Sequence, residues 1–200
     1  MFPKFIASQF KKPAGLLGNL IGNFMTKSNR NKYDRLINDI RPGANEKLLE
    51  IGYGPGIGIQ VIARLCESCQ IHGIDFSKLM YQRASRYNKS FIEKGKVQLE
   101  LGDFLDTTIT GGPYDKIYCL NVIYFWDELT RPLAKTRSLL KPGGIFYIYM
   151  LHDGFLKKKK TPDNIFNKYS IDVVVEALTS AGFSKTEHYF NKGYYIRAIR

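Results

Sequence analysis

The segment from Glu50 to Gly56, Glu-Ile-Gly-Tyr-Gly-Pro-Gly, has the residue types and spacing that point most directly to chemistry. Glycines at every second position let the backbone turn tightly and approach a bound molecule with no side chain between them. The segment follows an apolar run over residues 47–51, which predicts a strand, and precedes a helical pattern over residues 59–69. A helix that begins here presents unpaired amides to the same place. We therefore expect a ligand site where this strand ends.

The glycine pattern excludes two common nucleotide sites. The dinucleotide fingerprint needs glycines at relative positions one, three and six. Counted from Gly52 the sixth position is Ile57, and counted from Gly54 it is Ile59. A phosphate-binding P-loop also fails, because no Gly-Lys-Ser/Thr follows. The pattern that remains is E-x-G-x-G-x-G.

Two acidic residues follow later predicted strands. Asp75 comes directly after residues 70–74 and begins the sequence Asp-Phe-Ser-Lys-Leu-Met, in which Ser77 is placed to cap the next helix. Asp103 follows the strand predicted over residues 97–101, within Leu-Gly-Asp-Phe. A carboxylate can accept both hydrogen bonds of a vicinal diol. In open α/β sheets the ligand crevice lies at such strand ends.

Short apolar runs and helical patterns alternate along the chain and must position these residues. Strand–helix alternation of this kind predicts a doubly wound, mostly parallel sheet with helices on both faces. The last two strands, joined by Asn191-Lys192-Gly193, form a hairpin-like edge, so the last strand is antiparallel. Seven strands are predicted, over residues 47–51, 70–74, 97–101, 116–120, 145–151, 186–190 and 194–199. Helices are predicted over residues 59–69, 78–94, 170–181 and the stretch ending at 139–140.

Five of these segments, in this order, resemble the motifs of class I S-adenosylmethionine-dependent methyltransferases. The resemblance covers residues 48–200 and implies a Rossmann-like fold. Its segments are E-x-G-x-G-x-G at 50–56, Asp-x-Ser-x-x-Met at 75–80, Leu-Gly-Asp-Phe at 101–104, the fourth strand with Asn-Val-Ile-Tyr-Phe-Trp at 121–126, and Leu-Leu-Lys-Pro-Gly-Gly at 139–144. Ala181-Gly182-Phe183 is also typical of the family.

The resemblance implies S-adenosyl-L-methionine as the cofactor, S-adenosyl-L-homocysteine as its product, and in-line transfer of a methyl group to a small-molecule acceptor. It implies that Asp75 binds the ribose hydroxyls, that Asp103 and its neighbour meet the adenine, and that Glu50 lies below the amino-acid end. For Glu50, anchoring of the loop through backbone amides stays open as an alternative. The expected cofactor-binding residues are Glu50, Gly52, Tyr53, Gly54, Gly56, Asp75, Phe76, Met80, Asp103, Phe104 and Asn121. No catalytic side chain stands out, and no metal site is expected.

The segment 121–126 bears on the acceptor. It lacks the two prolines that family members acting on the amino groups of nucleic-acid bases often carry, so we do not expect a nucleic-acid substrate. It is more similar to methyltransferases of small molecules and of lipid quinones. Residues that could contact the acceptor are Tyr33, Tyr124, Trp126 and His152. For the aromatic residues, ordinary packing of the fourth strand stays open.

Residues 1–46 stand outside the alternating pattern and are expected to form a helical arm or lid beside a methyltransferase domain over 47–200. Apolar residues recur at helical spacing over 16–25, and Ser28 or Asn29 could cap a second helix through Ile40. Packing on the core, closure over a ligand, and contact with a membrane surface all stay open. The last of these rests on Phe2, Phe5 and Phe10, which lie among Lys4, Lys11 and Lys12.

The composition fits a globular domain. The chain has 200 residues, 44% of them hydrophobic, and a formal net charge of +12 that lies mostly towards its ends. Lys157–Lys160 is expected to be a solvated loop. The three cysteines include Cys66-x-x-Cys69, which we expect to be free thiols, and their odd number favours a cytoplasmic location. The oligomeric state is not indicated.

Overall fold

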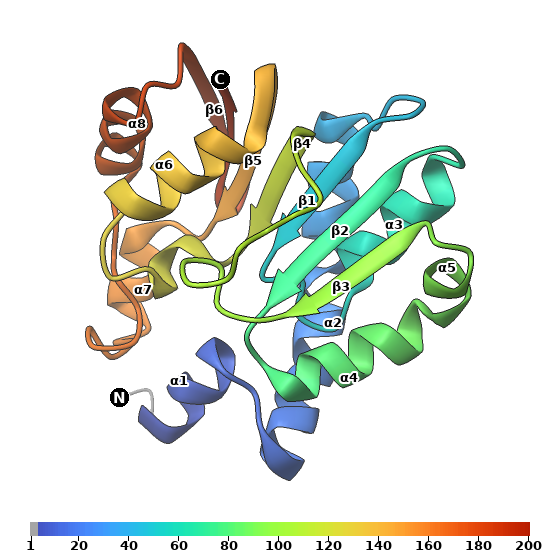
Figure 1. The fold of residues 1–200 in the computed structure, drawn as a ribbon. Helices are drawn as coiled ribbons and strands as arrows, with labels where there is room; N and C mark the ends of the chain where they lie inside the picture. The colour runs from blue at the N-terminus through green and yellow to red at the C-terminus, as the bar shows by residue number, and fades with distance from the viewer. Residues whose placement is uncertain (1–3) are drawn as a thin grey trace.

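The chain folds around one seven-stranded sheet, as the computed structural model shows for residues 4–200 (Figure 1). The strand order is β3-β2-β1-β4-β5-β7-β6, and β7 runs antiparallel to both of its neighbours. The strands are β1 (Lys47–Ile51), β2 (Gln70–Asp75), β3 (Val97–Leu101), β4 (Tyr114–Leu120), β5 (Leu140–Met150), β6 (Lys185–Phe190) and β7 (Tyr194–Ile199). This order, with β1 to β5 parallel, confirms the predicted Rossmann-like fold.

Helices pack on both faces of the sheet (Figure 1). Alternate residues of β1 enter two different cores, because side chains of a strand point to opposite faces. Leu48 packs with α2 and α3, whereas Leu49 packs with α6 and α8. The helices are α1 (Lys4–Lys11), α2 (Gly15–Ile40), α3 (Ile57–Leu65), α4 (Lys78–Tyr87), α5 (Lys89–Glu93), the short 3-10 helix η1 (Ile123–Phe125), α6 (Thr130–Leu139), α7 (Asp153–Lys158) and α8 (Ile171–Ser180).

Helix α2 is one continuous helix of 26 residues, so the predicted break at Ser28 or Asn29 is wrong. The Asn29 side chain does not cap a helix. Its Oδ1 accepts hydrogen bonds from Lys32 and from Asn121 across the fold. A Cβ atom at Gly18 would lie 2.8 Å from the backbone of Pro13, so close packing explains a glycine that otherwise weakens a helix.

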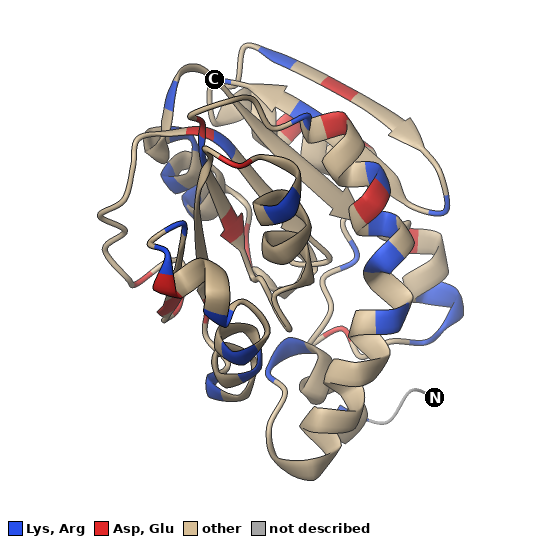
Figure 2. Cartoon of the chain, turned by 90° about the vertical axis from the view of Figure 1, so that its right-hand side faces the viewer, with Lys and Arg blue, Asp and Glu red and all other residues tan. Residues whose placement is uncertain are grey.

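The two halves of α2 differ in charge. Figure 2 shows blue and red segments along the half that leads into β1, and none along the half nearest the N-terminus. Residues 15–26 contain no charged side chain, whereas residues 27–40 contain six. Tyr33, Leu36, Ile37 and Ile40 of the charged half are buried against the sheet and α3. The predicted boundary between an arm over 1–46 and a domain over 47–200 stays a prediction.

The helix predicted over 78–94 is divided at Asn88 into α4 and α5. Asn88 is fully buried, and its side-chain amide donates to the carbonyl oxygens of Gly56 and Ala84. It thereby ties the end of α4 to the glycine-rich turn. This tertiary contact ends the helix, and local sequence alone does not indicate it.

Other boundaries moved by a few residues. The helix predicted over residues 59–69 is α3, which spans Ile57–Leu65 and so begins and ends earlier than predicted. The strand predicted over 145–151 is β5, which begins earlier, at Leu140, and shifts its register against β4 between Tyr114 and Lys116. The predicted loop at Lys157–Lys160 is partly helical, because Lys157 and Lys158 end α7.

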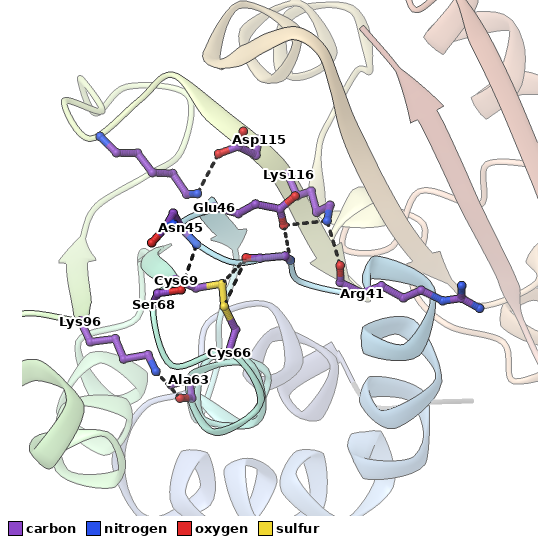
Figure 3. Close-up of a disulfide and its surroundings, with 12 residues drawn as sticks. Arg41, Asn45, Glu46, Ala63, Cys66, Ser68, Cys69, Lys96, Asp115 and Lys116 are labelled. Atoms are coloured by element: carbon purple, nitrogen blue, oxygen red, sulfur yellow. Dashed lines mark hydrogen bonds and ion pairs between the residues drawn. A yellow bond between two sulfur atoms is a disulfide. The ribbon is translucent and has the colours of Figure 1, made fainter.

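Cys66 and Cys69 form a disulfide, so the prediction of free thiols is wrong for this pair (Figure 3). Both sulfur atoms are buried between α3 and β2 and lie 3.3 and 3.0 Å from the carbonyl oxygen of Gly43. Cys119 remains a buried free thiol. The disulfide lies at the amino ends of β1 and β2, away from the strand ends that carry the glycine-rich turn.

Across residues 4–200, no helix combines the length and apolar character needed to cross a membrane.

Candidate active site

A cavity of about 790 Å³ opens at the carboxyl ends of the strands. Its volume lies in the range of small-molecule sites. The glycine-rich turn, the residues after β2, β3 and β4, the arm, and the segment after β5 all contribute to its wall. Among the predicted residues, the lining includes Gly52, Gly54, Asp75, Phe76, Met80, Asp103, Phe104, Asn121, Tyr124 and Trp126.

The glycines of the turn adopt backbone conformations that other residues rarely reach. Gly52, Gly54 and Gly56 have φ angles of 71°, 52° and 83°. A Cβ atom at Gly52 would lie 2.6 Å from Val122, and one at Gly56 would lie 2.8 Å from Ala84. The turn therefore needs glycine for conformation and for space. Gly52 and Gly54 present bare backbone to the cavity, whereas Gly56 packs against α4.

Asp75 is held at the cavity wall by backbone amides. Its Oδ2 accepts from the amide of Gly54 and its Oδ1 from the amide of Ser77, both at 2.8 Å. Burial raises the pKa of this carboxyl to about 6, although both hydrogen bonds oppose the shift. Each oxygen keeps a further lone pair, so the carboxylate can still accept hydrogen bonds from a diol in the cavity.

Asp103 and Phe104 form a second part of the wall. The Asp103 carboxylate accepts from the amide of Leu105 at 2.8 Å. The Phe104 ring is stacked on Trp126 at 6.2 Å, and the Lys135 ammonium lies 5.2 Å from its centroid. A flat apolar surface beside a carboxylate suits a heteroaromatic ring that carries an amino group.

Glu50 lies beneath the turn rather than in the cavity wall. It is fully buried, and Tyr33 and Tyr118 donate to its two oxygens at 2.6 and 3.0 Å. Burial raises its pKa to about 8, and the two tyrosine hydroxyls partly oppose that shift. A Cβ atom at Gly58 would lie 2.8 Å from both Glu50 oxygens. A backbone hydrogen bond from Ile59, at the start of α3, also lowers the pKa of Glu50. Both roles considered for Glu50, anchoring the turn and serving the amino-acid end of the cofactor, stay predictions.

Three other predicted residues have side chains outside the cavity wall. The Tyr53 hydroxyl donates to the carbonyl of Glu100, and the residue is fully buried. The Tyr33 hydroxyl donates its hydrogen bond to the buried Glu50. His152 caps α7 by accepting from the amide of Gly154, and its ring packs against Phe190 and Tyr194. Tyr53 therefore contributes only backbone to the turn, and Tyr33 and His152 do not reach the cavity.

A polar cluster at the arm side of the cavity was missed by the sequence analysis. Lys32 donates to Asn29 Oδ1 at 3.0 Å, Asn121 donates to the same oxygen at 3.1 Å, and Tyr124 donates to Asn121 at 2.5 Å. Burial lowers the pKa of Lys32. Met25, Asn29 and Lys32 lie on one face of α2 at helical spacing, and all three line the cavity. The helical spacing of Met25, Asn29 and Lys32 is the sequence pattern that could have predicted this shared face.

The bare glycine turn, the two carboxylates at successive strand ends and the aromatic wall define a site for a nucleoside cofactor on a Rossmann-like sheet. Comparison with known proteins identifies the family. Residues 48–144 match the family model described as a methyltransferase domain. Over 125 residues, the chain is 30% identical to the uncharacterized methyltransferase YdaC of Bacillus subtilis. The matched region covers 62% of this chain and 67% of that protein. The chain belongs to the class I S-adenosylmethionine-dependent methyltransferases.

More distant matches agree with the fold. The chain is 25% identical over 151 residues to the sterol 24-C-methyltransferase of Debaryomyces hansenii, across 70% of this chain but only 40% of that protein. A putative methyltransferase from Haloferax volcanii, solved in complex with the activator Trm112, superposes with a TM-score of 0.77 at 14% identity. That match covers 91% of this chain and 94% of the other, and at this identity it shows a shared fold.

Proposed function

We propose that this methyltransferase acts on a small-molecule acceptor with a large apolar face. The observation that carries the proposal is the composition of the cavity wall. The strand ends and the glycine turn supply polar groups for the cofactor. The same wall carries aromatic side chains that the cofactor does not need, from Phe10, Phe24, Tyr124, Phe125, Phe155 and Phe166, and Trp126, which stacks on Phe104.

The residues fit S-adenosylmethionine. We assign the ribose hydroxyls to Asp75, the adenine to Asp103 and Phe104 with Phe76 and Met80 nearby, and the amino-acid end to the backbone of the turn. Asn121 and Lys32 border that end from β4 and α2. Support for these assignments comes from the free acceptor capacity of Asp75 and from the side-chain-free wall at Gly52 and Gly54.

The bound cofactor supplies a methyl group on a positively charged sulfur, already activated for in-line displacement. The protein's task is then to align the acceptor and to exclude water, and alignment alone can lower a barrier substantially. Tyr124 is fully buried, and burial raises its pKa well above the ordinary value. Its hydroxyl stays protonated at neutral pH and orients Asn121 instead of acting as a base. We assign no catalytic base.

Calorimetric titration with S-adenosylhomocysteine tests the cofactor site, with NADH as the competing nucleotide. In Asp75→Asn we expect binding to weaken by about tenfold or more, since the substitution removes the charge that strengthens hydrogen bonds to the ribose. Asp172→Asn, on α8, is the matched control and should bind as the wild type does. NADH binding with no binding of S-adenosylhomocysteine would disprove the assignment.

Turnover assays test the acceptor class. Phenols, quinols and amines with apolar tails should be methylated in preference to free amino acids or nucleosides. Phe125→Ala should raise KM for an apolar acceptor more than it changes the affinity for S-adenosylhomocysteine, because Phe125 packs on Phe166 in the part of the wall not assigned to the cofactor. Equal turnover with polar and apolar acceptors would contradict the proposal.

A second candidate function is that of a cofactor-binding subunit, which methylates an acceptor only when a partner protein is bound. The likeness to a methyltransferase solved with an activator protein favours this candidate. It predicts binding of S-adenosylhomocysteine by the isolated chain without methylation of any acceptor. The cytoplasm remains our proposed location, and cell fractionation tests it.

A further inference from the structure

The arm exposes large apolar side chains that its own fold does not cover. Phe5 on α1 is 68% exposed, and Leu16, Leu20 and Phe24 on α2 are 86%, 64% and 58% exposed. Single exposed apolar residues are ordinary, but several on one small element mark an interaction surface. We call these four residues the apolar tip.

Basic residues flank the apolar tip. Between Lys12 and Lys27 the chain carries no charged residue at all. Lys4, Lys11 and Lys12 lie on or directly after α1. In Figure 2 the ribbon is uncharged over the first half of α2, and blue segments lie beside it. Phe2, part of the pattern seen in the sequence, lies outside the described residues.

The tip also borders the cavity. Phe24 belongs to the tip and lines the cavity wall, as do Phe10 and Lys11 of α1. Phe155 and Lys159 line the same cavity from the segment after β5. Phe155 is 46% exposed and lies next to the lysine run 157–160. Apolar and basic groups from two distant parts of the chain therefore line one cavity.

We propose that the apolar tip docks the protein on an anionic phospholipid membrane, so that an apolar acceptor enters the cavity from the bilayer. This rests on the proposed function for the nature of the acceptor. Interfacial binding of this kind combines shallow burial of apolar side chains with attraction of lysines to anionic headgroups. The apolar tip supplies the exposed apolar side chains, and the lysines beside it supply the positive charge. Charge complementarity therefore selects an anionic membrane over a neutral one.

Vesicle flotation of the full chain tests the proposal. One set of vesicles contains phosphatidylcholine alone, and in the other half of the lipid is phosphatidylglycerol. The wild type should float with the anionic vesicles and not with the neutral ones. Binding should weaken as salt is added, because salt screens the lysines.

Leu20→Ser and Leu65→Ser form a matched pair. Leu20 is 64% exposed on the tip, and Leu65 is 63% exposed where α3 ends, next to the disulfide cysteine Cys66. Leu20→Ser should reduce vesicle partitioning about tenfold, because burial of one leucine contributes roughly that much. The double variant Leu16→Ser/Leu20→Ser should abolish binding, and Leu65→Ser should leave it unchanged. Neither Leu16 nor Leu20 lines the cavity.

Three results would overturn the proposal: no flotation of the wild type with anionic vesicles, equal flotation of the Leu16→Ser/Leu20→Ser variant, or a stable dimer that this variant converts to monomer. The dimer would mean that a second copy of the chain covers the tip. Calorimetric binding of S-adenosylhomocysteine is measured on every variant. If docking fails while this binding persists, only the membrane proposal is wrong and the proposed function stands.

Discussion

The two halves of α2 belong to one hydrogen-bonded helix yet face different environments. In residues 27–40, Tyr33, Leu36, Ile37 and Ile40 are buried against the sheet, and Tyr33 reaches the carboxyl beneath the glycine turn. In residues 15–26, Leu16 and Leu20 are 86% and 64% exposed, and Phe24 lines the cavity. Continuity of a helix therefore says little about its stability, because tertiary contacts differ along it. Residues 27–40 pack on the sheet, whereas residues 15–26 bury Gly18, Ile21 and Gly22 and accept hydrogen bonds from Arg83.

The largest expected effect of a substitution comes from the buried half of α2, residues 27–40. Leu36 is 1% exposed, so Leu36→Ala leaves a cavity and should lower the free energy of unfolding by about 2–5 kcal/mol. Leu20→Ala, on the same helix, should change it by less than about 0.5 kcal/mol. Urea denaturation followed by circular dichroism measures both. Similar losses for the two variants would show that the halves are equally packed.

The next expected effect is a dependence of the free energy of unfolding on pH. Glu50 titrates near 4.5 when unfolded and at about 8 when folded. The folded state thus holds a proton that the unfolded state releases between these values, so stability falls as pH rises from about 4.5 to about 8. The fall should amount to several kcal/mol, on the order of 5. Asp75, with its pKa raised to about 6, adds to the fall at the acidic end.

Glu50→Gln should remove most of this pH dependence and leave the part due to Asp75. The measurement is the free energy of unfolding at a series of pH values. A slope that is unchanged in Glu50→Gln would assign the titration to another group.

The link between the buried half and the glycine turn should respond to Tyr33→Phe. This variant removes one donor to Glu50 and should cost about 1–3 kcal/mol. Because that hydrogen bond lowers the pKa of Glu50, its loss should also extend the pH-dependent fall to higher pH. Tyr118→Phe is the matched control, since it removes the other donor without touching α2. If only Tyr33→Phe weakens cofactor binding, α2 positions the turn.

The sequence predicted the sheet and the glycine turn because both depend on local patterns. Alternating apolar runs fixed the strands, and Gly52 and Gly56 are required by their own backbone angles and close neighbours. The missed features depend on contacts between distant residues. Asn88 ends α4 by reaching Gly56, and Asn121 donates a hydrogen bond to Asn29 at the cavity wall. Spacing along the chain does not encode which partner such a side chain will meet.

The smallest effect distinguishes two glycines in the solvent-facing half. Alanine in a helix interior is favoured over glycine by roughly 0.5–1 kcal/mol. At Gly22 the new Cβ would meet the end of the flexible Arg83 side chain, which also donates to the backbone of Asn19. At Gly18 it would lie 2.8 Å from the backbone of Pro13, which cannot swing away. Gly22→Ala should therefore be neutral or slightly stabilising, and Gly18→Ala destabilising by about 1 kcal/mol.

Hydrogen exchange at the amides of residues 18–26 measures this difference, since that half opens locally before the sheet unfolds. Gly18→Ala should speed exchange there and leave the amides of residues 33–40 unchanged. If both alanine variants slow exchange equally, α1 does not pack tightly on α2, and the solvent-facing half is held by its own hydrogen bonds. Acceleration that spreads to residues 33–40 would instead show that the two halves unfold together.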